Sequence, residues 1–487
     1  MGRNGSPDQP PPPGAPAHLA LGCSMTTPRG ALEQIWAVAG GDSAALERVS
    51  LTGDDPMLPT DVRIGTAAAA VIAATGLAVS EIWRLRTERA QSVAVDVRAA
   101  IAAFRSERYL RVNGGPAPDG RSALFGFYPT ADGRWIQIHA NLPHHHAGHV
   151  RFMGCEETRE SMAAAVLKWK AQDLEDALNG AGLPAGMVRP KDEWLAHPHA
   201  RAVAELPLLE IVRIGDSAPE PFAGGGARPL AGVRVLDLTR VIAGPEGGRT
   251  LASHGADVLL VGSPHLPSLP SHVIDFGLGK RNATLDLRRG GDADRLRALI
   301  TRADVFSQSY RPGALARLGF GPEEVARLRP GIVFVTLSAY GHAGPWRERR
   351  GFETLIQSVS GLAHEHGFGG GLDRPLHLPA QVVDHATGYL AALGALMALA
   401  RRAREGGSYL VRVSLVQTGR WVDGLGRVAG RHVADQTPAD VGDLLAACES
   451  AFGQITHVTP TARLSETPPF WASPPVPAGT HEAGWPT

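Results

Sequence analysis

VRVLDLTRVIAGPEGGRTLASHGADVLLV, residues 233–261, predicts a strand, a helix and a second strand, and this unit decides the fold class. Its first apolar run, 233–238, is short and rich in Val and Leu, as a buried strand is. Pro245 suits the first turn of the following helix, because its missing N–H would have no partner there. A strand, a helix and a strand in this order predict a parallel sheet.

More units of the same kind follow along the chain. Helices at 292–302 and 322–328 alternate with strands at 305–308 and 332–337. We therefore predict an α/β fold whose large domain, residues 229–435, is a doubly wound, Rossmann-like domain.

The loop after the first strand is the candidate ligand site of this domain. Ligands of such sheets bind at the carboxyl ends of the strands, where residues 240–245, RVIAGP, meet a helix N-terminus. No G-x-G-x-x-G motif follows the strand, and Gly262 and Ser263 stand where a dinucleotide-binding domain carries an acidic residue. The sequence therefore disfavours a nicotinamide-dependent dehydrogenase.

An internal repeat relates two distant parts of the chain. Residues 68–97 match residues 386–415 at a spacing of 318, and each copy predicts a long Ala-rich helix, a polar turn and a strand. Thr66 occupies in the first copy the place that Asp384 has in the second. We therefore predict that residues 31–105 are a partial copy of the large domain that lacks this acid.

The rest of the chain predicts a smaller domain and its connections. Two strand-like runs within 127–140 surround the turn Ala131-Asp132-Gly133, and helices are predicted within 156–182 and 191–205. This pattern indicates a small α+β domain at 106–215. A disordered Pro-rich leader, a linker and a C-terminal tail are predicted at 1–30, 216–228 and 436–487.

Composition limits the possible partners and the compartment. Of the 487 residues, 48 are Lys or Arg and 48 are Asp or Glu, so no basic surface suggests nucleic acid or an anionic membrane as a partner. The Ala-rich run 67–79 ends at Ser80 and Glu81, short of the roughly 18 residues that span a membrane. Three widely spaced cysteines suit a reducing compartment, and we expect a cytoplasmic protein.

Five consecutive blocks resemble the family III CoA-transferases, which include formyl-CoA transferase and carnitine CoA-transferase, with the related α-methylacyl-CoA racemases. The blocks are ARPLAGVRVLDLTRVIAGP, GADVLLV, GKRNATLDL, ADVFSQSYRPGALARLGFG and VTLSAYGHAGPW, and the resemblance covers about 227–430 and 124–215. Family members usually place the small domain after the large-domain segment that holds the catalytic Asp. This chain places it first, and so resembles a rearranged or fused member with permuted segment order.

The resemblance implies acyl-CoA:carboxylate CoA-transfer through an aspartyl-CoA thioester. Asp384, in PAQVVDHATGYLAALGALMAL, falls on the position of the family's nucleophile. With an ordinary pKa of about 4, this carboxylate is expected to be charged at neutral pH without a general base. The partners would be an acyl-CoA donor and a small carboxylate acceptor. Coenzyme A enters as a substrate, no tightly bound cofactor is expected, and family members are homodimers.

Further site residues are carried over from the same resemblance. Tyr340 would lie beside the thioester, and Gly114 and Gly115 loosely match the glycine loop that closes over the Asp in formyl-CoA transferase. The residues expected to contact CoA are Arg240, Ala243, Lys280, Arg281 and Arg317.

Other interpretations remain open at this stage. A 2-methylacyl-CoA racemase is one, although Phe352 stands where racemases of the family carry a catalytic His. A non-catalytic CoA-binding scaffold is another, since Thr66 has no charge and Gly262-Ser263 lacks a family anchor for the nucleotide. His144, His145, His146 and His149 have i, i+3 spacing but no adjacent acid, and we expect no metal site.

Overall fold

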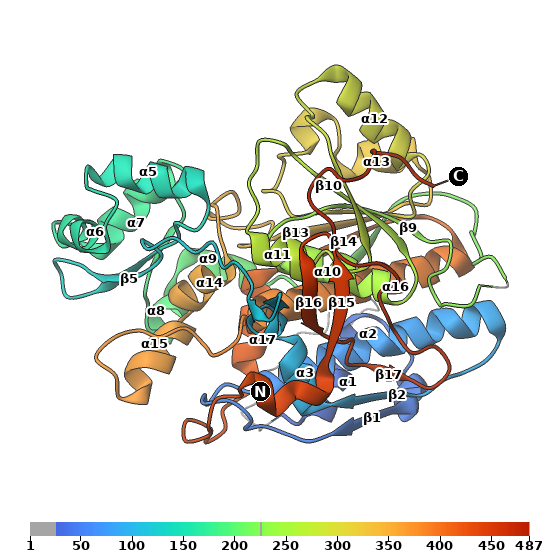
Figure 1. The fold of residues 1–487 in the computed structure, drawn as a ribbon, viewed down its shortest axis with the longest axis horizontal. Helices are drawn as coiled ribbons and strands as arrows, with labels where there is room; N and C mark the ends of the chain where they lie inside the picture. Colours follow the sequence, from blue (N-terminus) through green and yellow to red (C-terminus); the bar gives the residue numbers. More distant parts are fainter. Residues whose placement is uncertain (1–25, 225, 487) are drawn as a thin grey trace, which may run out of the picture.

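The computed structural model describes residues 26–224 and 226–486, and its largest element is a seven-stranded sheet (Figure 1). Its strand order is β11-β10-β9-β12-β13-β14-β8. Six strands are parallel, and β8 (Glu210–Gly215) is antiparallel to β14. The parallel strands are β9 (Arg234–Leu238), β10 (Asp257–Gly262), β11 (Lys280–Thr284), β12 (Val305–Gln308), β13 (Val333–Ser338) and β14 (Ser408–Ser414).

Alternating strand residues bury the two faces of this sheet under different helices, so the doubly wound fold is confirmed. Val235 and Val333 belong to the core that contains α10 (Ala243–Ser253) and α16 (Val382–Glu405). Leu236 and Phe334 belong to the core that contains α12 (Gly290–Ile300) and α13 (Pro322–Leu328). The remaining helices of this part are α11 (Pro270–Asp275), η2 (Ala316–Leu318) and α17 (Leu415–Gly424).

The two copies of the repeat pack against each other. Helix α2 (Ile64–Thr87) lies along α16, and the bounds of these 24-residue helices are offset by the predicted 318 residues. Both are long and apolar enough to cross a membrane, but 94% of each apolar window is buried inside this protein. A small sheet of order β1-β2-β17 lies beside α2. Its strands and the neighbouring helices are β1 (Val49–Thr52), β2 (Val93–Asp96), β17 (Arg463–Leu464), α1 (Pro28–Val38), η1 (Ser43–Arg48) and α3 (Val97–Ala103).

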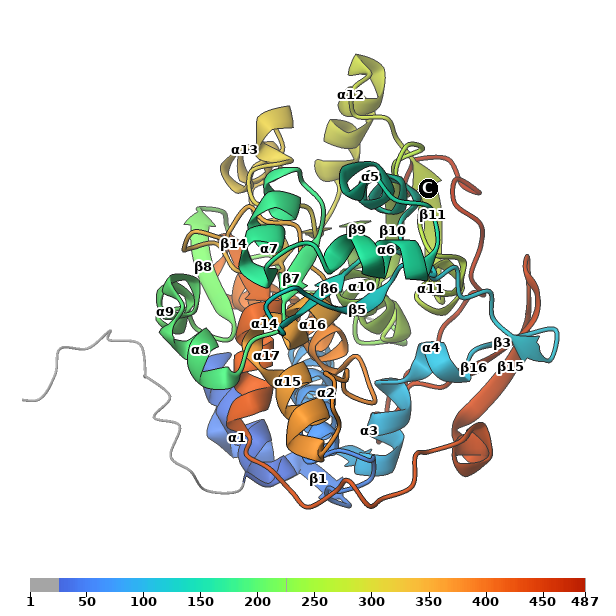
Figure 2. The ribbon, with the colours of Figure 1, turned by 90° about the vertical axis from the view of Figure 1, so that its left-hand side faces the viewer.

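The small domain lies to one side of the large domain, and Figure 2 views it from the front. The predicted hairpin around residues 131–133 joins β5 (Gly126–Pro129) to β6 (Trp135–Ile138), and β7 (Ala185–Met187) pairs with β6. Its helices are α5 (Pro143–Met153), α6 (Arg159–Val166), α7 (Ala171–Gly180), α8 (Lys191–Ala196) and α9 (Pro198–Ala204). Helices α14 (Glu353–Ser360), α15 (Leu362–Gly367) and η3 (Phe368–Gly370) lie against it.

Two predicted boundaries differ from the structure. The small domain was predicted to extend to residue 215, but β8 completes the edge of the large sheet because its backbone pairs with β14. The predicted leader 1–30 lies outside the described residues up to 25, and α1 already begins at Pro28, where Thr27 caps its N-terminus.

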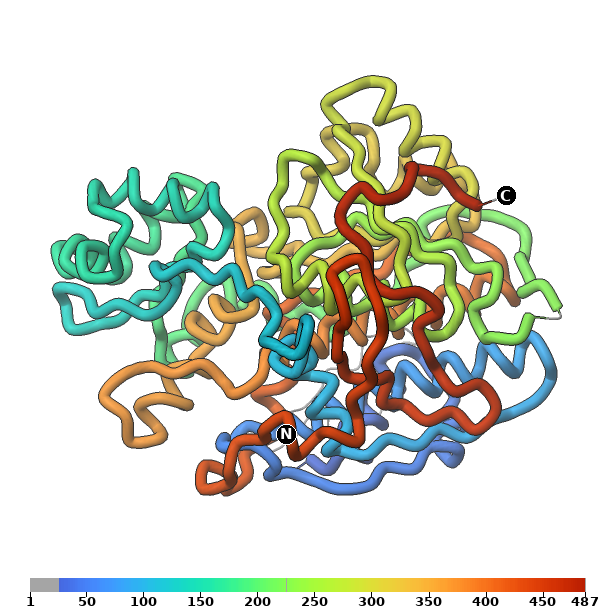
Figure 3. Tube along the Cα trace, viewed as in Figure 1, coloured from blue at the N-terminus to red at the C-terminus, as the bar shows by residue number. Residues whose placement is uncertain are grey.

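The C-terminal segment runs across the molecule and ends near α12 and α13, as the trace in Figure 3 shows. It first forms a four-stranded sheet with a hairpin from the start of the small-domain segment. These elements are η4 (Pro438–Leu444), β15 (Leu445–Ser450), β16 (Gly453–Val458), α4 (Ser106–Tyr109), β3 (Arg111–Val112) and β4 (Gly115–Pro116). Farther on, Trp485 packs into the core beneath α12.

Candidate active site

Asp384 lies in the first turn of α16 and is 6% exposed. Its carboxylate faces a cavity of about 100 Å³. Across the part of the chain that the structure describes, this carboxylate accepts no hydrogen bond and forms no ion pair. A buried carboxylate without such a partner is costly, and residues of this kind concentrate at functional sites.

Close helix packing places this turn. A Cβ on Gly388 would lie 2.5 Å from the backbone oxygen of Ala243, so only glycine allows α16 to approach α10 this closely. The same contact brings Glu246 of α10 next to His385. In the sequence D-H-x-x-G, the glycine therefore allows the close approach of α16 to α10, and the histidine contacts α10 next to Asp384.

Glu353 is a second buried carboxyl group in the cavity. It is the first residue of α14 and is 1% exposed, and its Oε1 accepts a hydrogen bond of 2.6 Å from Gln357 Nε2. Burial and the nearby charge of Asp384 raise the pKa of Glu353 above its usual range. The sequence analysis did not identify this partner, although an acid at the start of an apolar helix was a visible signal.

The ionisation of Asp384 differs from the expectation. Burial raises the pKa of Asp384, the charge of His385 lowers it, and the charge of Glu107 raises it further, with a net increase. The ordinary pKa of about 4 therefore does not apply. Because burial raises the pKa of both groups and the charge of Asp384 raises that of Glu353, ionisation of both carboxyl groups at once is unfavourable.

A buried cluster of charged residues surrounds His385, the residue that follows Asp384. The two ring nitrogens of His385 face Glu246 at 2.9 Å and Glu107 at 3.3 Å. Although burial opposes the charged form, these hydrogen bonds raise the pKa of His385 to about 10. Arg249 continues the cluster, since its guanidinium contacts Glu246 and lies 2.9 Å from Asp275. The imidazolium next to Asp384 is thus a fixed positive charge.

Both halves of the chain line the cavity. Asp384, Glu353 and Phe352 belong to the second half, and the ring of Phe352 stacks on His139 of the small domain at 3.6 Å. Two arginines and two further histidines also line the cavity. These residues are Arg108, Arg121, His272 and His377.

Three arginines gather beside the loop that begins with Arg240. Burial and the charges of Arg311 and Arg240 lower the pKa of Arg350, so these guanidinium groups lie close together. Arg240 donates to the backbone oxygen of Pro267, and none of the three forms an ion pair with an acid among the described residues. Such a cluster suits a ligand with several negative charges.

An apolar cavity of about 300 Å³ is lined by Tyr310, which directly precedes Arg311 in the chain. It lies at the carboxyl ends of β9, β10 and β12, where Leu238, Val261 and Tyr310 form its wall, and Gly262 and Ser263 also line it. This is the position at which doubly wound sheets bind their ligands.

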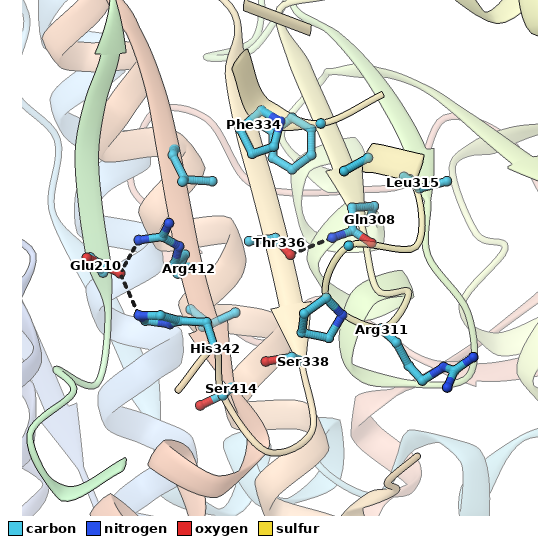
Figure 4. A pocket seen from close by; sticks show the side chains of 18 of the residues that line it. Glu210, Gln308, Arg311, Leu315, Phe334, Thr336, Ser338, His342, Arg412 and Ser414 are labelled. Atoms are coloured by element: carbon cyan, nitrogen blue, oxygen red, sulfur yellow. Dashed lines mark hydrogen bonds and ion pairs between the residues drawn. The ribbon is translucent and has the colours of Figure 1, made fainter. Parts of the chain in front are cut away.

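A third cavity, of about 190 Å³, opens on the face of the sheet that carries α13 (Figure 4). Several of its polar side chains bind one another, while Arg311, one of the three arginines described above, also lines it. Arg412 donates to Glu210 at 3.0 Å, and Gln308 donates to Thr336. Because these groups are already paired, this cavity lacks the free carboxylate that marks the Asp384 cavity.

The predicted CoA contacts fall into two groups. Arg240 and Ala243 lie on the loop and helix start beside the arginine cluster. Lys280, in contrast, is 2% exposed, and its ammonium donates to Asp237 and to the backbone oxygen of Pro245, both at 2.8 Å. This burial corrects the expectation that Lys280 faces a phosphate.

The other two predicted contacts lie on β11 and on η2. Arg281 donates to the backbone oxygen of Gly484 at 2.8 Å, so the C-terminal segment covers it. Arg317 is exposed on η2.

Tyr340 and the glycine pair Gly114-Gly115 also do not line the cavity around Asp384. Tyr340 is 2% exposed and packs edge-on against Trp346, as a core residue does. Gly114 and Gly115 lie on the β3–β4 hairpin beside β16. The small domain contributes polar side chains to the site in place of the expected glycine loop.

The histidines of α5 lie in different surroundings. His149 is fully buried, while His146 contacts the Ser122 hydroxyl at 2.7 Å. Within 26–224 and 226–486, no group of three or more His, Cys, Asp or Glu side chains has the geometry to hold a metal ion.

Comparisons with known proteins show the family of the chain. The model of CoA-transferase family III matches residues 40–207 and 230–451. The acetyl-coenzyme A transferase nodX of Hypoxylon pulicicidum is 33% identical over 62% of this chain and 54% of its own length. An acyl-CoA transferase of Gibberella moniliformis is 31% identical over 77% of this chain and 73% of its own length. The matched part of this chain thus spans about half the length of the Hypoxylon pulicicidum protein.

A solved structure is also similar over part of the chain. The hypothetical protein Rv3272 of Mycobacterium tuberculosis shares 32% identity over 39% of this chain and 56% of its own, with a TM-score of 0.37.

Proposed function

Because the chain belongs to CoA-transferase family III, we propose that it transfers CoA from an acyl-CoA thioester to a carboxylate, with Asp384 as the nucleophile. The observation that carries the proposal is the buried carboxylate of Asp384, which faces a cavity without any bonded partner. An acyl group that enters this cavity meets a carboxylate that is not engaged in an ion pair or a hydrogen bond.

The proposed reaction proceeds in balanced steps. The Asp384 carboxylate attacks the thioester carbonyl, the C–S bond breaks, and an acyl-aspartyl anhydride and CoA thiolate form. The thiolate then attacks the aspartyl carbonyl, which releases the first carboxylate and leaves an aspartyl-CoA thioester. The acceptor carboxylate repeats these steps in reverse, so that the new acyl-CoA leaves and Asp384 is regenerated.

The charges around Asp384 support this role. The His385 imidazolium favours the ionised form of its neighbour Asp384. Glu353 has its Oε2 buried without a hydrogen-bond partner, and burial together with the charge of Asp384 raises its pKa, so the proton of the pair resides on Glu353 in this proposal. The nucleophile then carries the negative charge that attack requires.

The likeness of the large domain to nucleotide-binding sheets supports a place for CoA. We propose that the adenosine occupies the 300 Å³ apolar cavity and that the phosphates lie beside Arg240, Arg311 and Arg350. The thioester would then reach Asp384 along the loop that starts with Arg240, since Val241 lines the Asp384 cavity.

Trapping the intermediate tests the proposal. The protein is incubated with an acyl-CoA, treated with hydroxylamine or borohydride, digested and analysed by mass spectrometry. We expect the peptide that contains Asp384 to be modified in the wild type and unmodified in Asp384→Asn. CoA binding without any modified peptide during incubation would instead indicate the scaffold alternative.

A further inference from the structure

Glu353 and Asp384 are two buried acids that line one cavity, but only Glu353 is held by a hydrogen bond. Its Oε1 accepts from Gln357 Nε2 at 2.6 Å, and Gln357 Oε1 accepts from the backbone N–H of Leu378 at 2.8 Å. Because a backbone N–H can only donate, the amide of Gln357 must present its NH2 group to Glu353. A fixed donor of this kind favours the ionised form of a carboxyl group.

Opposing influences act on the proton of Glu353. Burial and the negative charge of Asp384 raise the pKa of Glu353, while the hydrogen bond from Gln357 and the positive charge of His385 lower it, with a net increase. Burial also lowers the pKa of three histidines of the lining to about 3, 4 and 3, so these rings do not titrate near pH 7. Besides the two acids, the titratable side chains that line the cavity are His139, His272, His377, Arg108 and Arg121.

The proposed reaction removes one of these influences. When Asp384 becomes an anhydride or a thioester, it carries no charge, and the released acid leaves as a carboxylate. Of the two influences that keep Glu353 neutral, burial alone then remains. Gln357 and His385 still favour the ionised form, so loss of the charge on Asp384 favours loss of the proton from Glu353.

From this arrangement we infer that Glu353 is a positioning residue that releases and takes up one proton as Asp384 loses and regains its charge. Asp384 carboxylate, neutral Glu353 and acyl-CoA give aspartyl-CoA, ionised Glu353, a free carboxylate and a proton. The cavity then keeps one negative charge near the His385 imidazolium throughout the cycle. Attack by the acceptor carboxylate regenerates ionised Asp384, and Glu353 takes its proton back. This inference rests on the proposed function at Asp384.

Counting protons tests the inference. The protein is mixed with excess acyl-CoA, without an acceptor, in weakly buffered solution at pH 7 with a pH indicator, and aspartyl-CoA is trapped with borohydride in parallel samples. A thioester and a carboxylate exchange groups without releasing a proton, so the proton comes from the protein. Asp384→Asn, which forms no thioester, gives the baseline for binding. We expect about 0.5 to 1 proton per aspartyl-CoA in the wild type. Trapped aspartyl-CoA without proton release would overturn the inference.

Variants show whether Glu353 supplies the proton. Glu353→Gln keeps the shape but cannot ionise, so we expect less than about 0.1 proton per aspartyl-CoA. Gln357→Met removes the donor to Glu353, and we expect the release at pH 7 to fall at least about twofold. Asp373→Asn is the control, because Asp373 is exposed and does not line the cavity. Because the count is per aspartyl-CoA formed, a smaller folded fraction does not change it.

Two results with the variants would contradict the role of Glu353. Release from Glu353→Gln that equals the wild-type value would overturn the inference. If Glu353→Gln forms no aspartyl-CoA, an undiminished release from Gln357→Met would overturn it instead.

The same samples separate this inference from the proposed function. If no aspartyl-CoA can be trapped in the wild type, the proposed function is wrong and the inference fails with it. If aspartyl-CoA is trapped but no proton is released, the proposed function stands and the inference about Glu353 is wrong.

Discussion

Asp384→Asn should remove activity and at the same time stabilise the fold. The amide has the shape of the carboxyl group but is a poor nucleophile, so we expect turnover to fall at least about 1,000-fold, or ~4 kcal/mol of barrier. The ionised Asp384 lowers the free energy of unfolding of the wild type, because its carboxylate is buried without a bonded partner. The variant also relieves Glu353, whose pKa is raised by Asp384.

The gain in stability of Asp384→Asn over the wild type depends on pH. Because the pKa of Asp384 is higher in the folded protein than in the unfolded chain, the folded wild type loses stability as pH rises between those two values. Each unit of difference corresponds to about 1.4 kcal/mol. The advantage of Asn is therefore absent below about pH 4, where the carboxyl group is protonated in both states. It is complete above the raised pKa of the folded protein.

Melting temperatures from pH 5 to pH 9 measure this effect. We expect the Tm of Asp384→Asn to exceed that of the wild type at pH 8 to 9, and the difference to shrink toward pH 5. Asp373→Asn is the control, because Asp373 is an exposed acid outside the cavity and should change neither Tm nor turnover. A variant that melts below the wild type at pH 8 would refute the reasoning that Asp384 is an uncompensated buried charge.

Four further variants test other parts of the site. Lys280→Ala should lower the free energy of unfolding by ~3–5 kcal/mol, measured as a lower Tm, because it leaves the buried carboxylate of Asp237 unpaired. A raised KM for acyl-CoA with an unchanged Tm would instead support the phosphate contact that the sequence predicted for Lys280. Arg350→Ala should raise the KM for acyl-CoA about 10- to 150-fold with little change in kcat, as measured by steady-state kinetics. An unchanged KM would contradict a role of Arg350 in binding the phosphates. His385→Gln should move the acidic limb of the pH–rate profile to higher pH, because the cation that favours ionised Asp384 is lost; an unmoved limb contradicts that role. Thr66→Ala should leave turnover within about threefold, since Thr66 lies in α2 and does not line the cavity, and a loss above about 100-fold without unfolding would reveal a second centre.

Much of the fold was encoded locally and could be predicted. The strands at 233–238 and 257–261 are short apolar runs, and the repeated helices are Ala-rich segments that end at a polar turn. Such patterns depend on residues that are close together in the chain, so they can be recognised from the sequence alone. The placement of β8 could not be predicted in this way, because its partner β14 lies about 200 residues away along the chain.

The sequence by itself determined the position of Asp384 at the start of a helix and the loss of that acid in the first copy at Thr66. Only the tertiary structure decided the state of the charged groups. It buried Lys280 against Asp237, brought Glu353 and Asp384 into one cavity, and placed His139 of the small domain there as well. A side chain's charge and reactivity depend on the water it loses and on the charges it meets, and both come from residues distant in sequence.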